Sequence, residues 1–244
     1  MQQHHLSLII PVYNAASFIE DTVEKLKRWK EKQDFDVEIL IVNDGSSDET
    51  ETVLKIIPPD DDDFKLISYS KNRGKGYAVK SGMLAATGEV RIFTDADIPY
   101  GLDVIHKILQ SLLEDNYEVC IGNRLDKDSD YHVTMTFLRK LSSKLFTFFV
   151  KSFTIKNVGD TQCGIKGFTA FAANKIFSKT RIDGFAFDVE SIYLCYKFNI
   201  SIKRSPVQFQ GNKISTINLF SSSIRMFIDV ISLPFRYHIL KQYK

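Results

Sequence analysis

The sequence predicts an α/β protein whose central sheet is mostly parallel and flanked by helices. Through the first 122 residues, apolar runs typical of strands alternate with segments whose apolar residues recur at helical spacing. This order favours β-α-β units, and therefore parallel strands with helices on both faces of the sheet. The first apolar run, Leu6 to Val12, is nearly continuous, as expected for a strand that is buried on both faces.

Each further element follows from a local pattern. Ile19, Val23, Leu26 and Trp29 recur at helical spacing, and Ser17 is placed to act as the N-cap of that helix. Acidic residues in the turn at 44–48 suit the positive end of a second helix, which is expected to run through residue 54. The other predicted elements are strands at 37–42, 64–69, 90–93 and 118–122, and helices at 77–86 and 102–113.

The second half of the chain has a different character. Two segments, 137–153 and 217–240, are amphipathic, basic and rich in phenylalanine and leucine. This profile is typical of helices that lie in a membrane interface, although core helices and contacts within a homo-oligomer share it. We expect one domain over residues 1–215, followed at 216–244 by an amphipathic helical segment that is part of the same domain or a membrane-interface element.

Composition narrows the possible partners and compartment. The formal net charge of +2 argues against nucleic acid as a partner. The three cysteines are far apart and form no CxxC pair, which favours a reducing compartment over a disulfide framework or a zinc site. No window holds the roughly 18–20 uncharged apolar residues of a spanning helix, and the first residues do not resemble a signal peptide. A cytoplasmic protein, peripheral at the inner face of the membrane, is therefore expected.

Asp95 and Asp97 come directly after the predicted strand at 90–93. Side chains alternate faces along a strand, so the two carboxylates point the same way if the extended geometry persists to its end. Two like charges held together favour a cation between them, and Mg²⁺ or Mn²⁺ suits a pair of oxygen ligands. The alternative is a solvated turn at the end of the strand.

Other turns that follow predicted strands suit a nucleotide. Tyr13, in the turn at 11–14, offers a face for stacking a base, and Asp44 can accept the imide N–H of uracil. The basic turn at 72–76 enters a helix, where backbone amides, the helix dipole and cationic side chains favour a pyrophosphate. Because ligands of such sheets bind at the carboxyl ends of the strands, we expect all of these turns to share one edge.

Short motifs along the chain match the pattern of a known enzyme family. They are PVYN at 11–14, NDGSSD at 43–48, NRGKGYAV at 72–79, DAD at 95–97, GNR at 122–124, DTQCGIKGF at 160–168, FAFDVE at 185–190 and GNKI at 211–214. Together they resemble family 2 glycosyltransferases with the GT-A fold, and more narrowly the dolichyl-phosphate β-glucosyltransferases and their polyprenyl-phosphate relatives. The turn at 72–76, DTQCG and AFDVE are the more specific motifs, and they indicate the glucosyl branch.

The resemblance implies a role for each matching residue. Asp95 and Asp97 would bind the divalent metal that bridges the diphosphate of UDP-glucose, with Asp97 as the more direct ligand. Asp188, Asp160 and Arg124 would be the catalytic group, and Glu190 would join the carboxylates of the acceptor side. The nucleotide-sugar site would comprise Pro11, Tyr13, Asn14, Asp44, Gly74, Lys75, Asp95, Ala96, Asp97 and Gln162, and the cations around the phosphates would be Arg124, Arg139 and Lys213.

The implied reaction moves a hexose, glucose from UDP-glucose in the leading interpretation, to a polyprenyl or dolichyl phosphate with inversion. The second pKa of a phosphate monoester is about 6, so such an acceptor is largely anionic at neutral pH and needs no strong base. The alternative is a soluble enzyme of the same fold that acts on a saccharide hydroxyl in cell-surface polysaccharide synthesis. That acceptor needs a carboxylate base, and Asp188 is the candidate by motif. A nucleotidyltransferase and a catalytically inactive sugar-nucleotide-binding module are further alternatives.

Overall fold

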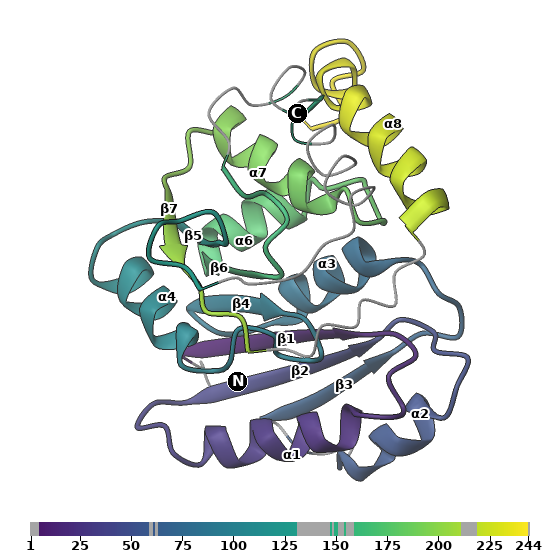
Figure 1. The fold of residues 1–244 in the computed structure, drawn as a ribbon, viewed down its shortest axis with the longest axis vertical. Helices are drawn as coiled ribbons and strands as arrows, with labels where there is room; N and C mark the ends of the chain where they lie inside the picture. Colours follow the sequence, from purple (N-terminus) through teal and green to yellow (C-terminus); the bar gives the residue numbers. More distant parts are fainter. Residues whose placement is uncertain are drawn as a thin grey trace.

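The computed structural model describes residues 5–58, 61, 63–130, 147, 149–150, 154, 159–210 and 219–243. Within these residues, a seven-stranded sheet in the order β3-β2-β1-β4-β6-β5-β7 crosses the molecule (Figure 1). Its strands are β1 (Leu6–Val12), β2 (Val37–Asn43), β3 (Phe64–Ser68), β4 (Val90–Thr94), β5 (Val119–Asn123), β6 (Ile165–Thr169) and β7 (Ile202–Pro206). The helices are α1 (Ile19–Lys30), α2 (Thr50–Val53), the short 3-10 helix η1 (Leu54–Ile56), α3 (Lys75–Ala85), α4 (Val104–Leu113), α6 (Ala170–Phe177), α7 (Phe187–Lys197) and α8 (Leu219–His238).

The sheet is mostly parallel, which confirms the predicted class. β1 pairs in parallel with β2 and β4, β2 with β3, and β5 with β7. β6 is antiparallel to both of its neighbours, β4 and β5. Its first residue, Ile165, pairs with Thr94, the last residue of β4. The loop before β6 therefore meets the loops that follow the parallel strands, all at one edge of the sheet.

Helices cover both faces of the sheet and bury two hydrophobic cores (Figure 1). One core lies under α1, η1 and α4, and the other lies under α3, α6, α7 and α8. β1 supplies both, because Leu8 and Ile10 belong to the first core and Ile9 to the second. This two-sided burial explains why the first strand is a nearly continuous apolar run.

Several local expectations are wrong. Ser17 does not cap α1, since the N-cap position is Phe18, whose side chain makes no capping hydrogen bond. α3 begins at Lys75, before the expected residue 77, because Gly74 takes the N-cap position with a φ of 108°. The sequence did not predict β6, whose run Ile-Lys-Gly-Phe-Thr is interrupted by a lysine and a glycine.

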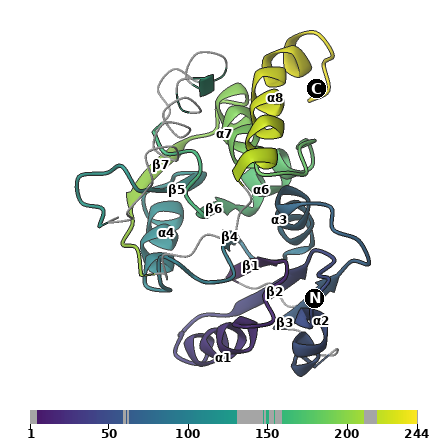
Figure 2. The same ribbon diagram turned by 45° about the vertical axis from the view of Figure 1, so that its right-hand side comes forward.

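α8 packs along α7 at the end of the molecule away from α1 (Figure 2). Its Val230 and Leu233 are buried in the second core together with Tyr243, which follows the helix. No helix among the described residues is both long and apolar enough to cross a membrane. Most of the segment 137–153 lies outside the described residues, so its amphipathic helix stays a prediction. Among the side chains that the structure describes, the large apolar ones exposed on and just after α8 are Ile224, Ile228, Phe235, Ile239 and Leu240.

Candidate active site

Polar loops converge on the carboxyl edge of the sheet, as expected. The ends of β1 and β2 are level, because Val12 pairs with Asn43. The end of β4 lies beside the start of β6, which places the DTQCG loop next to Asp95. The edge therefore collects the turns after β1, β2, β3, β4 and β5, the loop before β6, and the first turn of α7.

Asn14 fastens the turn after β1 to the turn after β2. Its Oδ1 accepts from the backbone N–H of Ser47 at 2.8 Å, and its own N–H donates to Ser46 Oγ at 3.0 Å. Its φ of 50° is left-handed, a conformation that asparagine tolerates well. The neighbouring Tyr13 is 51% exposed, so its ring is accessible at this edge, while Pro11 is half-buried within β1.

Asp44 ties the turn after β2 to the basic turn at 72–76. Its buried carboxylate accepts from the backbone N–H groups of Arg73 and Gly74, at 2.9 and 2.7 Å, and from Asn72 Nδ2 at 2.9 Å. Burial raises the pKa of Asp44, and these two amides oppose the rise. The sequence did not reveal this anchoring role, and the contact of Asp44 with uracil stays a prediction.

The basic turn differs from the expected backbone cradle for a pyrophosphate. The amides of Arg73 and Gly74 are engaged by Asp44, and the amide of Tyr77 donates to the carbonyl of Asp183 at 3.1 Å. For these three amides the expectation is wrong, because protein acceptors already satisfy them. Gly74 is required here, since a Cβ would lie 2.5 Å from the Asp183 carbonyl oxygen and φ is left-handed. The turn instead presents the side chain of Lys75.

Asp95 and Asp97 lie in a turn, and the assumption of persistent extended geometry is wrong. β4 ends at Thr94, and the N–H of Ile98 donates to the Asp95 carbonyl at 2.9 Å. Burial by the surrounding chain and then the Asp95 carboxylate raise the pKa of Asp97, although Asp97 keeps contact with solvent. Ile98 has a φ of 45°, a strained conformation for a β-branched residue of the kind found at functional sites.

The carboxylate of Asp95 is held from two sides. Lys75 Nζ lies 2.5 Å from its Oδ1. Burial would lower the pKa of Lys75, but the carboxylates of Asp95 and Asp188 raise it above its usual value. On the other side, a Cβ at Gly164 would lie only 2.1 Å from Asp95 Oδ2. The glycine of the DTQCG motif therefore makes room for this carboxylate.

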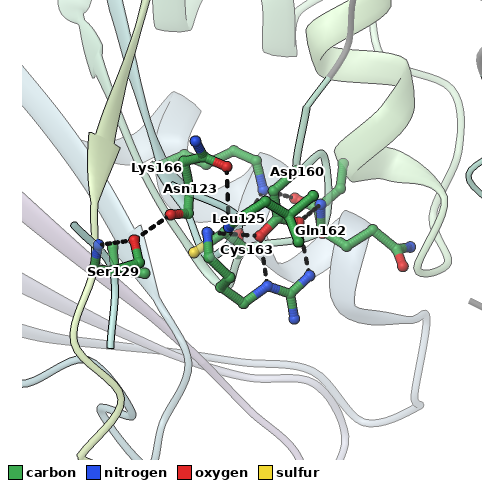
Figure 3. A network of polar contacts seen from close by, with 10 residues as sticks. Asn123, Leu125, Ser129, Asp160, Gln162, Cys163 and Lys166 are labelled. Atoms are coloured by element: carbon green, nitrogen blue, oxygen red, sulfur yellow. Dashed lines mark hydrogen bonds and ion pairs between the residues drawn. The ribbon is translucent and has the colours of Figure 1, made fainter. Parts of the chain in front are cut away.

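Arg124 and Asp160 form a bidentate ion pair. Arg124 Nε and Nη2 donate to the two carboxylate oxygens of Asp160 at 2.5 and 2.7 Å, and the Arg124 backbone N–H adds a third bond at 3.1 Å. Burial would raise the pKa of Asp160, but Arg124 lowers it below its usual value. The amide of Gln162 also donates to Asp160, and Figure 3 shows this loop beside Asn123 at the end of β5. The structure thus brings together three of the predicted residues.

Lys166 is a site residue that sequence reasoning missed. It is fully buried in β6, near Cys163 (Figure 3), and its Nζ donates to the carbonyl of Cys163 at 2.7 Å and forms an ion pair with Asp188. Burial raises the pKa of Asp188, whereas the ammonium groups of Lys166 and Lys75 counteract the rise. The sequence offered one indication of this role, a single lysine inside an apolar run. A lysine in such a run is expected to be buried, and a buried ammonium needs a counter-charge.

Glu190 anchors the fold, and its expected place among the carboxylates of the acceptor side stays a prediction. Its fully buried carboxylate accepts from the backbone N–H groups of Arg181 and Ile182, each at 2.9 Å, and from the hydroxyl of Tyr243 at 2.6 Å. These bonds fix the loop before α7 and the segment after α8. Arg139 and Lys213, the cations expected near the acceptor phosphate, lie outside the described residues.

The turn at Asp95–Asp97 suits a divalent cation that arrives with other ligands. Within the described part of the chain, no group of three or more histidine, cysteine, aspartate or glutamate side chains could hold a metal ion. The two carboxylates offer hard oxygen donors, and the carbonyl of Ala96 accepts from Thr22 Oγ1 at 2.9 Å, which fixes the turn against α1. Such a donor set fits Mg²⁺ or Mn²⁺, which commonly combine one or two carboxylates with phosphate oxygens and water.

Comparison with known proteins identifies the family. The family model described as glycosyl transferase family 2 matches residues 7–177, which is more than half of the chain. The chain belongs to glycosyl transferase family 2. This assignment makes the protein a glycosyltransferase, and it agrees with the family that the motifs indicated.

Similar curated proteins narrow the assignment within family 2. A dolichyl-phosphate beta-glucosyltransferase from Dictyostelium discoideum is 36% identical, over 96% of this chain and 75% of the relative. The Saccharomyces cerevisiae and Homo sapiens proteins of the same name are 32% and 30% identical, each over 95% of this chain and 75% of the relative.

Solved structures of similar fold come from other glycosyltransferases. Mannosyl-3-phosphoglycerate synthase from Rubrobacter xylanophilus superposes with a TM-score of 0.71 at 15% identity, covering 96% of this chain and 74% of that one. A second similar structure is glucosyl-3-phosphoglycerate synthase from Mycobacterium tuberculosis, in complex with Mn²⁺, UDP and glucosyl-3-phosphoglycerate. It superposes with a TM-score of 0.67 at 14% identity, covering 94% of this chain and 79% of that one. At such identities the likeness concerns the fold alone, and it confirms the GT-A fold of this family 2 protein.

Proposed function

We propose that this family 2 glycosyltransferase moves glucose from UDP-glucose to the phosphate of a polyprenyl or dolichyl lipid, with inversion at the anomeric carbon. The observation that carries the proposal is the similarity to dolichyl-phosphate beta-glucosyltransferases, which reaches 36% identity and covers 96% of the chain. Because the match covers nearly the whole chain, it includes the donor-side turns and the acceptor-side motifs together.

The site is suited to substrates that carry much negative charge. A divalent cation at Asp95 and Asp97 would neutralise the departing diphosphate. The glucosyl-3-phosphoglycerate synthase of the same fold contains Mn²⁺ and UDP, which supports such a cation here. Lys75 adds a cation beside Asp95, and the fixed pair of Arg124 and Asp160 gives the loop after β5 a rigid position. Catalysis would then rest on positioning and charge neutralisation.

A phosphate acceptor would need no general base from the protein. A phosphate monoester with a second pKa of about 6 is largely ionised at neutral pH and can attack directly. A saccharide hydroxyl would need a base, and Asp188, whose pKa burial raises, is the residue that would serve. The identity of the acceptor therefore separates the proposal from its alternative.

The test is a transfer assay with the purified full chain and Mg²⁺. UDP-glucose labelled in the sugar is incubated with undecaprenyl or dolichyl phosphate in detergent micelles, and a parallel reaction contains oligosaccharides in place of the lipid. The proposal expects label in the organic phase, in a product that mild acid hydrolyses. Label found only in the oligosaccharide would favour the hydroxyl alternative, and faster transfer from another nucleotide sugar would correct the donor.

We also propose that α8 contacts the membrane in which a lipid acceptor resides. Ile224, Ile228, Phe235 and Ile239 are each more than half exposed, and their spacing of four, seven and four residues puts them on one side of the helix axis. Arg225 and Lys241 are exposed near the two ends of this apolar stripe, where they suit anionic headgroups. The opposite side of α8 is buried against the protein core.

Liposome flotation tests this contact. Wild-type protein is expected to float with vesicles that contain anionic lipid, and the double substitution Ile228→Ser with Phe235→Ser should reduce the bound fraction. Phe171→Ser is the matched control, because Phe171 is 60% exposed but lies on α6. Equal flotation of the double variant and the control would rule out α8 as the contact.

A further inference from the structure

Lys75 pairs with Asp95, one of the two carboxylates proposed to bind the metal. Its ammonium lies 2.5 Å from Asp95 Oδ1, and both side chains are partly buried, at 21% and 34% exposure. The second oxygen of Asp95 is packed against the backbone of Gly164. An ammonium in contact with this carboxylate lowers the affinity of Asp95 for any further cation, because the two positive charges would repel at short range.

Only the side chain of Lys75 is free to move. Its backbone lies between Gly74 and Gly76, and a Cβ at either glycine would come within 2.6 Å of a carbonyl oxygen in the loop before α7. The amide of Tyr77 is bonded to that same loop, so the start of α3 is fixed in place. The lysine side chain, by contrast, is a flexible four-carbon stem with three rotatable donors.

A second carboxylate is available to Lys75. Lys75 Nζ lies 6.0 Å from the centroid of the ring of Phe187, the residue next to Asp188 at the start of α7, and the Asp188 carboxylate raises the pKa of Lys75 together with Asp95. Asp188 itself is held by Lys166, which is fully buried and also bonded to the carbonyl of Cys163. One neighbour of Lys75 thus belongs to the proposed metal pair, whereas the other is fixed by a buried lysine.

We propose that Lys75 is the internal counter-cation of Asp95. Without nucleotide, Lys75 neutralises Asp95 and leaves Asp97 as the exposed acid of the pair, so the protein binds a divalent cation weakly. When the cation arrives with the diphosphate of the donor, it takes Asp95, and the Lys75 ammonium turns towards Asp188 and the anionic diphosphate. Metal and nucleotide therefore bind together. This inference rests on the proposed nucleotide-sugar site and goes beyond it by assigning an exchange of partners to Lys75.

Binding of Mn²⁺ alone tests the inference without any measurement of activity. Electron paramagnetic resonance reports free Mn²⁺ during titration of the full chain in the absence of nucleotide. Wild-type protein is expected to bind weakly, and Lys75→Met should bind about tenfold more tightly because its competitor for Asp95 is gone. Lys80→Met, which removes a lysine from the same helix but away from Asp95, should match the wild type. Lys75→Gln provides a second variant if the methionine impairs folding.

Addition of UDP gives a second readout. UDP should strengthen Mn²⁺ binding strongly in the wild type and less in Lys75→Met, because the variant has no ion pair to break. A crystal structure with UDP and Mg²⁺ should show Lys75 Nζ away from Asp95. The inference is overturned if Lys75→Met binds Mn²⁺ no more tightly than Lys80→Met, or if the contact between Lys75 and Asp95 persists in that complex.

These outcomes are independent of the acceptor. A protein that shows the exchange but transfers no glucose to lipid would refute the proposed function and leave the role of Lys75 intact. Efficient transfer of glucose to lipid, with Mn²⁺ binding unchanged in Lys75→Met, would support the proposed function and refute the role of Lys75.

Discussion

Replacing Gly164 with alanine tests whether the position of the Asp95 carboxylate limits catalysis. A Cβ at residue 164 would lie 2.1 Å from Asp95 Oδ2, so the carboxylate would have to move by about 1.3 Å to reach ordinary contact at 3.4 Å. The φ of Gly164 lies outside the left-handed region, so alanine adds no backbone strain. The atom displaced is the end of a partly exposed side chain, and the surrounding core is untouched.

The expected effect is therefore large on activity and small on stability. A displacement of about 1 Å in a catalytic constellation typically costs about 100-fold in rate, which corresponds to about 2.7 kcal/mol. The melting temperature should stay within about 2 °C of the wild type, because no buried apolar contact is lost.

Initial rates of glucose transfer at saturating metal, together with thermal melting, measure both quantities. Gly184→Ala is the matched control, since nothing lies within 4 Å of its Cβ, and it should keep wild-type activity. Wild-type kcat/KM in Gly164→Ala would refute the reasoning. A fall in melting temperature large enough to account for the lost activity would refute it equally.

Three further perturbations test the buried polar contacts. Arg124→Met leaves the buried Asp160 carboxylate without its ion-pair partner and should lower the free energy of unfolding by about 3 kcal/mol or more, measured by urea denaturation. A decrease below about 1 kcal/mol would contradict the pairing. Burial would raise the pKa of Glu38, but hydrogen bonds from Lys65, Ser7 and the Thr87 amide lower it below its usual value. The ionised Glu38 therefore stabilises the fold fully above its unfolded pKa of about 4.3, and this stabilisation is lost as the pH falls through the pKa of Glu38 in the folded protein. The free energy of unfolding of the wild type should fall between pH 7 and 3, and the fall should be smaller in Glu38→Gln. If both proteins show the same dependence of unfolding free energy on pH, Glu38 is not the source of the loss. Tyr243→Phe removes a hydrogen-bond donor from the buried Glu190 carboxylate and should lower the free energy of unfolding by about 1–3 kcal/mol in chemical denaturation. An unchanged free energy of unfolding would contradict this.

The location of the site could be predicted from local sequence patterns. Apolar runs marked β1, β2 and β4, and the turn residues after them had to meet at one edge once the strands were parallel. Asp44, Asp95 and the turn at 72–76 all lie there. The details of each turn could not be predicted, because a chain reversal at Ile98 replaces the extended geometry on which the alignment of Asp95 with Asp97 depended.

The sequence by itself determined the alternation of strands and helices and the family motifs, because hydrophobic periodicity and turn chemistry are local properties of the chain. The tertiary structure alone decided which charges meet: Lys75 with Asp95, Arg124 with Asp160, and the unpredicted Lys166 with Asp188. Asp160 and Lys166 reach their partners because β6 enters the sheet antiparallel between β4 and β5, whereas Lys75 reaches Asp95 because the start of α3 lies beside the end of β4. Strand order is a global property that depends on packing, so no local pattern around these residues could reveal it.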